Sequence, residues 1–148
     1  MRVVVFSPSL PLPLGTADAR WLHVMLAELS RRGLEVTVIS CTEEGDQAVA
    51  EAADLAALNC FELIHVPLEF DESRVARKLS SATKPFSEYL RCTNLAKIIE
   101  NELVKGYDIF HIEHLFPTWA GLGKARSVTY LHHLEVVSIK AFTHHQDF

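Results

Sequence analysis

The chain has 148 residues and a formal net charge of −5, with 49% hydrophobic and 22% charged residues. A chain of this length fits one domain that hides roughly two thirds of its unfolded surface, and the composition excludes a disordered protein. The acidic balance without a basic stripe excludes non-specific nucleic-acid binding, and no segment approaches the ~20 apolar residues that span a bilayer. The 3 cysteines lack C-x-x-C spacing, so we expect a reducing compartment, the cytoplasm, with any membrane contact peripheral at its inner face.

The first 40 residues predict a complete strand, helix and strand unit. An apolar, β-branched run at Val3–Phe6 indicates a strand that is buried on both faces. Prolines interrupt the next segment, until Gly15 allows a tight approach and Thr16 caps a helix whose apolar residues repeat at i, i+3, i+4 and i+7. Gly33 ends this helix, and a second strand follows over 36–39.

The rest of the chain alternates between helical and strand patterns. We expect a helix over 46–58, a strand over 61–66, a surface loop with one helical piece over 68–84, a helix from Pro85 to Leu103, a strand over 107–112, a short helical or turn segment over 115–124, a strand over 128–131 and a helix over 135–145. This alternation predicts an α/β fold class, namely a Rossmann-like three-layer α/β/α domain. Its sheet is expected to be mostly parallel, with about five strands in the order 3-2-1-4-5.

Several catalytic signatures do not occur in the sequence. The run from Gly121 to Lys124 is followed by Ala125 and lacks the P-loop pattern, and only Gly15 stands where a dinucleotide site needs G-x-G-x-x-G. Neither G-x-S-x-G nor H-E-x-x-H is present. These absences argue against a P-loop hydrolase, a dinucleotide oxidoreductase, an α/β-hydrolase and a zinc protease of the common type.

Four consecutive segments carry a family resemblance. They are the strand MRVVVFSP, the proline-rich loop that ends in Gly15-Thr16-Ala17, the helix end LSRRG and the strand EVTVIS. Together they resemble the N-terminal domain of GT-B glycosyltransferases, in particular the acceptor-side domain of the retaining, family 4-like group. The resemblance extends through nearly the whole chain.

The resemblance implies both an organisation and an activity. Residues 1–148 are expected to form a single Rossmann-like domain, the N-terminal half of an enzyme whose C-terminal, donor-binding domain is absent from this chain. The whole enzyme is expected to move a sugar from a nucleotide-diphosphate sugar to a hydroxyl acceptor such as a sugar, a lipid-linked sugar or a small molecule. No cofactor and no metal are implied beyond that co-substrate. This chain alone is expected to be inactive unless the other half is supplied in cis or by a separate chain.

The loop residues Gly15, Thr16 and Ala17 are the first candidate site. A helix N-terminus at the carboxyl edge of a parallel sheet suits a phosphate or a carboxylate. The alternative is a plain small-residue turn followed by a helix cap. The resemblance implies that this loop touches the diphosphate of the donor.

The segment from Tyr107 to His114 is the second candidate. His111 falls inside the strand, where we expect a buried, hydrogen-bonded core histidine. Glu113 and His114 follow where the sheet opens, and the segment is similar to the family's D-V-V-H-x-H run. That similarity implies catalytic roles for Glu113 and His114. Because Glu113 stands where the family has its second histidine, which of the two faces the cleft stays open.

The segment from Thr129 to Glu135 is the third candidate. It is similar to the family's fifth strand, in which a histidine follows an apolar run and a glutamate comes three residues later. His132 is thereby implied to be catalytic, and His133 and Glu135 to bind the acceptor. The alternative is that these polar residues only finish a strand and cap the next helix.

The histidines also suggest functions other than glycosyl transfer. The set at the strand ends could hold zinc, but consecutive residues of a strand point to opposite faces and the usual ligand spacing is missing, so we expect no metal site. A small metal-dependent hydrolase and a non-catalytic binding or regulatory module of the same fold remain as alternatives.

Overall fold

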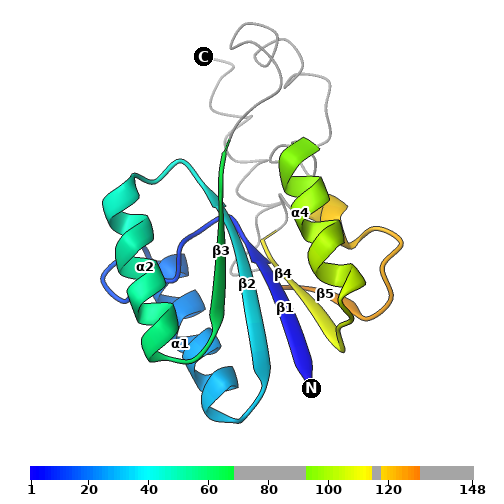
Figure 1. Ribbon diagram of the computed structural model, residues 1–148, viewed down its shortest axis with the longest axis horizontal. Helices are drawn as coiled ribbons and strands as arrows, with labels where there is room; N and C mark the ends of the chain where they lie inside the picture. The colour runs from blue at the N-terminus through cyan, green and yellow to red at the C-terminus, as the bar shows by residue number, and fades with distance from the viewer. Residues whose placement is uncertain (69–92, 115–117, 131–148) are drawn as a thin grey trace, which may run out of the picture.

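The computed structural model describes residues 1–68, 93–114 and 118–130. Figure 1 shows the path of the chain. Its elements, in order, are β1 (Arg2–Ser7), α1 (Ala17–Arg31), β2 (Glu35–Thr42), α2 (Asp46–Leu58), β3 (Glu62–Pro67), α4 (Thr93–Val104), β4 (Ile109–Glu113), the 3₁₀ helix η2 (Thr118–Gly121) and β5 (Ser127–Tyr130).

The sheet confirms the predicted fold class and strand order. Its five strands are all parallel in the order β3-β2-β1-β4-β5, so the domain is Rossmann-like. β1 lies at the centre because Val3–Phe6 is apolar throughout and these residues are buried. In register, Val5 of β1 pairs with Val38 of β2 and with His111 of β4.

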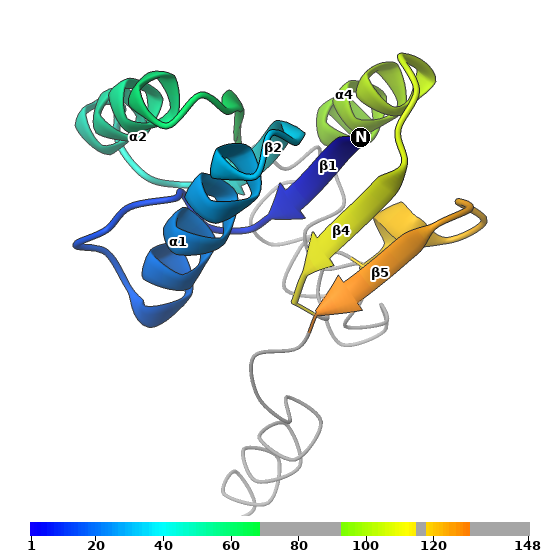
Figure 2. The same cartoon turned by 90° about the horizontal axis from the view of Figure 1, so that it is seen from below.

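Helices cover both faces of the sheet. Figure 2 shows α1 and α2 on one side and α4 on the other. The apolar residues divide in the same way, since alternate residues of a strand point to opposite faces. The α1 side of the core contains Val3, Val5, Leu22, Leu26, Val36, Val38, Ala56 and Phe61. The α4 side contains Val4, Phe6, Ile39, Leu95, Ile99, Leu103, Phe110, Ile112 and Trp119.

The helix ends follow local chemistry. The Thr16 hydroxyl accepts a hydrogen bond from the Ala19 N–H at 3.3 Å, which confirms the predicted cap of α1. Gly33 ends the same helix in the left-handed region, at a φ of 77°. α2 ends in the same kind of turn, but there the left-handed residue is Cys60, at a φ of 58°.

Element boundaries differ from the predictions at a few points. The structure places Glu113 in β4 as its last residue, whereas the pattern predicts a strand that ends one residue earlier. The short helical segment is observed as η2. Residues 69–84 of the loop predicted over 68–84, the start of the helix at Pro85, and the helix over 135–145 lie outside the described residues. In the described part of the chain, no helix has both the length and the apolar character needed to cross a membrane.

Candidate functional site

The carboxyl ends of the five strands meet at one edge of the sheet. From β1 the chain crosses to β2 on one side, and β4 lies on the other side of β1, so the strand order reverses between β1 and β4. Ligands of open α/β sheets bind at such a reversal, beyond the carboxyl ends of the strands. The loop that follows β1 and the end of β4 both lie at this edge.

The loop after β1 is fastened to the sheet. The Ser40 hydroxyl of β2 donates to the Ser9 carbonyl at 2.9 Å, and the Ser7 hydroxyl accepts from the Ser9 N–H at 3.1 Å. Leu10 is fully buried and anchors the loop by apolar contact. This short irregular loop therefore has a fixed path to α1.

The three predicted loop residues are accounted for largely by the turn itself. The Gly15 N–H donates to the Leu12 carbonyl at 3.2 Å, and a Cβ on Gly15 would lie 2.8 Å from the Ala19 Cβ. Glycine is therefore required for the close approach between the loop and the first turn of α1. Thr16 acts as the cap, and Ala17 is the exposed first residue of α1. The turn-and-cap interpretation explains Gly15 and Thr16 without a ligand.

His114 links the end of β4 to the start of α1. Its Nε2 lies 3.5 Å from Oδ2 of Asp18, in the first turn of α1, and the two form an ion pair when the imidazole is protonated. The backbone of His114 is left-handed, at a φ of 71°, which is uncommon for a residue other than glycine. His114 is only 6% exposed. Strained backbone of this kind is concentrated at functional sites, so it adds weight to the predicted site.

Glu113 is paired with His111. The two residues are two positions apart in β4 and so lie on the same face of the sheet, with His111 Nε2 2.5 Å from Glu113 Oε1. Glu113 is 1% exposed, whereas the His111 side chain is 17% exposed. The expectation of a hydrogen-bonded histidine is confirmed, but His111 is partly rather than fully buried. Neither Glu113 nor His114 is broadly open to solvent.

The edge therefore carries two pairs of an acid and an imidazole, Asp18 with His114 and Glu113 with His111. Such pairs can orient a hydroxyl group and can take part in proton transfer. Sequence reasoning missed two of these four residues. It gave Asp18 no role in the site and assigned His111 only to the core, although the period of two in a strand places His111 beside Glu113.

The third candidate segment extends beyond the part of the chain that the structure describes. His132, His133 and Glu135 lie outside the described residues, so their predicted roles stay predictions. Within residues 1–68, 93–114 and 118–130, no three His, Cys, Asp or Glu side chains are grouped so that they could hold a metal ion.

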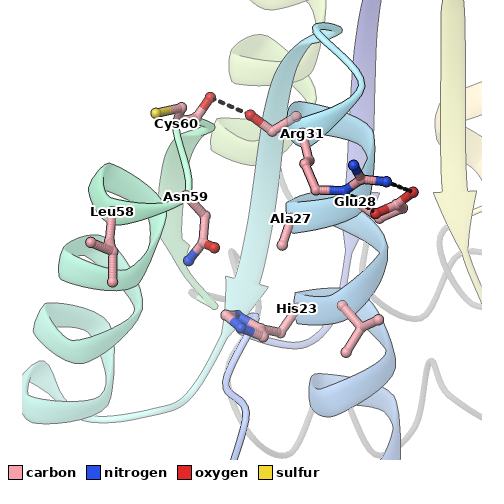
Figure 3. Close-up of a pocket in the computed structure, with 9 residues that line it drawn as sticks. His23, Ala27, Glu28, Arg31, Leu58, Asn59 and Cys60 are labelled. Carbon is pink, nitrogen blue, oxygen red and sulfur yellow. Dashed lines mark hydrogen bonds and ion pairs between the residues drawn. The ribbon is translucent and has the colours of Figure 1, made fainter.

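A separate open groove of about 510 Å³ lies between α1 and the end of α2 (Figure 3). Its lining residues are His23, Val24, Ala27, Glu28, Ser30, Arg31, Leu58, Asn59 and Cys60. Hydrogen bonds from the guanidinium groups of Arg31 and Arg32 lower the pKa of the Glu28 carboxyl to about 2. Of the predicted site residues that the structure describes, none lines this groove, so it is a different surface from the carboxyl edge.

Comparisons of the chain with protein-family models, with curated proteins and with solved structures find no match.

Proposed function

We propose that this chain is the acceptor-side half of a GT-B type glycosyltransferase that works in the cytoplasm. The whole enzyme would transfer a sugar from a nucleotide-diphosphate sugar to a hydroxyl acceptor. The observation that carries the proposal is the Asp18–His114 pair, because it joins the first turn of α1, directly after the loop that follows β1, to the end of β4 at the reversal of strand order. The family resemblance implies that the loop before α1 touches the donor diphosphate and that the end of β4 carries catalytic residues.

The proposed chemistry divides between two halves. On this chain, the imidazole groups hold the acceptor hydroxyl close to the sugar that is transferred, which lowers the entropic part of the barrier. The leaving diphosphate lies near the start of α1, where backbone N–H groups favour negative charge. Asp18 places a carboxylate at the same helix end. The donor half must therefore supply positive charge to offset the repulsion between Asp18 and the diphosphate.

The proposal is tested with the natural gene product. The protein is captured from its source cells, its intact mass is measured, and release of nucleoside diphosphate is followed with a panel of nucleotide-sugars and hydroxyl acceptors. A mass above 16.6 kDa identifies a longer chain, and a mass equal to it directs the search to a separate donor half. If no donor and acceptor combination gives turnover, the transferase proposal fails and a non-catalytic binding module takes its place.

Two variants test the site itself. His114→Asn removes the imidazole but keeps a residue that tolerates left-handed backbone, and Asp18→Asn removes the charge of its partner. We expect each to lower turnover by about 10²-fold or more, the usual contribution of a positioned acid or base. Glu35→Gln, on an exposed side chain at the start of β2, is the matched control. Wild-type turnover in both site variants would remove Asp18 and His114 from the mechanism.

A further inference from the structure

The carboxylate of Glu113 is enclosed by protein, and the imidazole that it binds reaches the surface. Glu113 is 1% exposed, while the side chain of His111 is 17% exposed. A ligand at the carboxyl edge therefore reaches His111 more easily than Glu113. This order of access is the reverse of the roles that the resemblance implies, in which Glu113 acts directly.

The hydrogen bond between the two residues defines the chemical state of the imidazole. When the Glu113 carboxylate is ionised it only accepts hydrogen bonds, and Nε2 of His111 is then the donor in the 2.5 Å contact with Glu113. In the neutral ring the proton is then on Nε2, and Nδ1 has the character of an acceptor. A buried carboxylate in this position both orients the ring and selects its tautomer.

In the described part of the sheet, the two strand neighbours of His111 differ in exposure. In the sheet register, His111 lies between Val5 of β1, which is fully buried, and Val128 of β5, which is exposed. Residues that pair across parallel strands share a face of the sheet. His111 is thus at the border between the core under α1 and the accessible part of the sheet over β5.

From these observations we infer that Glu113 is a positioning residue and that His111 is the residue that contacts the ligand. His111 accepts a hydrogen bond from the hydroxyl group of the acceptor, and Glu113 holds the ring in the tautomer that allows it. The assignment of that hydroxyl to a sugar acceptor rests on the proposed function. The pairing and the tautomer do not depend on it.

The first test uses the chain itself and needs no ligand. Long-range ¹H–¹⁵N NMR spectra of protein with ¹⁵N-labelled histidine report the tautomer of each neutral ring, and His111→Gln identifies the signals of His111. We expect the Nε2–H form in the wild type at pH 8 and loss of that preference in Glu113→Gln, because an amide can donate as well as accept. Asp18→Asn, which changes the partner of His114, should leave the His111 signals in place.

Either of two NMR results would overturn the inference. One is an Nδ1–H tautomer of His111 in the wild type, a result that does not depend on whether any variant folds. The other is an unchanged His111 spectrum in folded Glu113→Gln. Both can be obtained even if no transferase activity is ever found, so failure of the inference is distinguishable from failure of the proposed function.

The second test uses the active enzyme, once a donor and an acceptor are known. His111→Gln and Glu113→Gln should each raise the KM for the acceptor about 5- to 150-fold, the range for loss of one hydrogen bond, with little change in the KM for the donor. The double variant should be no worse than the single ones, because both single variants remove the same hydrogen bond. Additive losses, or a normal acceptor KM in His111→Gln, would contradict the assignment.

Discussion

A buried ion pair at the amino edge of the sheet should make a measurable contribution to stability. The Arg2 guanidinium pairs with the Glu102 carboxylate, and so joins β1 to α4. The side chain of Glu102 is 3% exposed and that of Arg2 is 14% exposed. A second cation, Lys105 Nζ, lies 2.6 Å from the same carboxylate. Glu102 thus compensates two positive groups, one of which is largely buried.

Glu102→Gln keeps the size of the side chain and removes its charge. Removing one partner of a buried ion pair costs about 3–5 kcal/mol, because the other charge is left uncompensated. Arg2 retains a second partner, since its Nε lies 3.2 Å from Oε1 of Glu35, and this lowers the expected loss to about 2–3 kcal/mol. For a chain of about 150 residues, a loss of that size lowers the Tm by roughly 4–12 °C.

Glu35→Gln is the matched control, because it acts on the same guanidinium. The Glu35 side chain is 72% exposed, so solvent screens the pair and its loss should cost less than about 1 kcal/mol. Urea unfolding followed by circular dichroism, with the slope checked for constancy, gives both values. Equal losses in Glu102→Gln and Glu35→Gln would refute the argument that burial decides the strength of the pair.

Three further predictions concern helix ends and the groove. Cys60→Gly should raise the free energy of unfolding by about 0.5–1 kcal/mol, because glycine has no Cβ penalty at a φ of 58°. Gly33→Ala, at the equivalent position of α1, should lower the free energy of unfolding by about 1 kcal/mol. Urea midpoints that move the opposite way would contradict this reasoning. Gly15→Ala should lower the free energy of unfolding by about 1–3 kcal/mol, since its Cβ would be 2.8 Å from the Cβ of Ala19 in the first turn of α1. An unchanged urea midpoint would show that the loop can move. The Glu28 carboxyl should titrate near a pKa of about 2 in NMR spectra, and Arg31→Gln should raise that pKa. Because the pKa is lowered on folding, the stabilisation from this carboxylate is present above its ordinary pKa of 4.5 and is lost as the pH falls toward 2. A pKa near 4.5 in the wild type would argue against the hydrogen bond.

Much of the fold could be predicted because its signals are local. The apolar run Val3–Phe6 indicates a strand buried on both faces, and the cap at Thr16 and the glycine at position 33 delimit α1 within a few residues. Alternation of strands and helices then leads to a parallel sheet, whose handedness rule restricts the strand order. The order 3-2-1-4-5 followed from these steps and was confirmed.

The candidate site could be predicted only in part. The positions of Glu113 and His114 at the end of a strand follow from the hydrophobic pattern, and so does their place at the carboxyl edge. Their burial does not follow from that pattern, since it depends on what packs against β4. The groove between α1 and α2 gave no signal in the sequence, because its lining comes from two helices whose separation is set by the sheet.

The sequence alone determined which segments form strands and helices, since propensity, caps and periodicity act within a few residues. Only the tertiary structure decided that Asp18 meets His114 and that His111, rather than Glu113, reaches the surface. Both outcomes depend on the parallel register of β1 and β4 and on where α1 begins above them. Contacts between distant segments are set by the packing of whole elements, and no local pattern encodes the distance between two side chains on different elements.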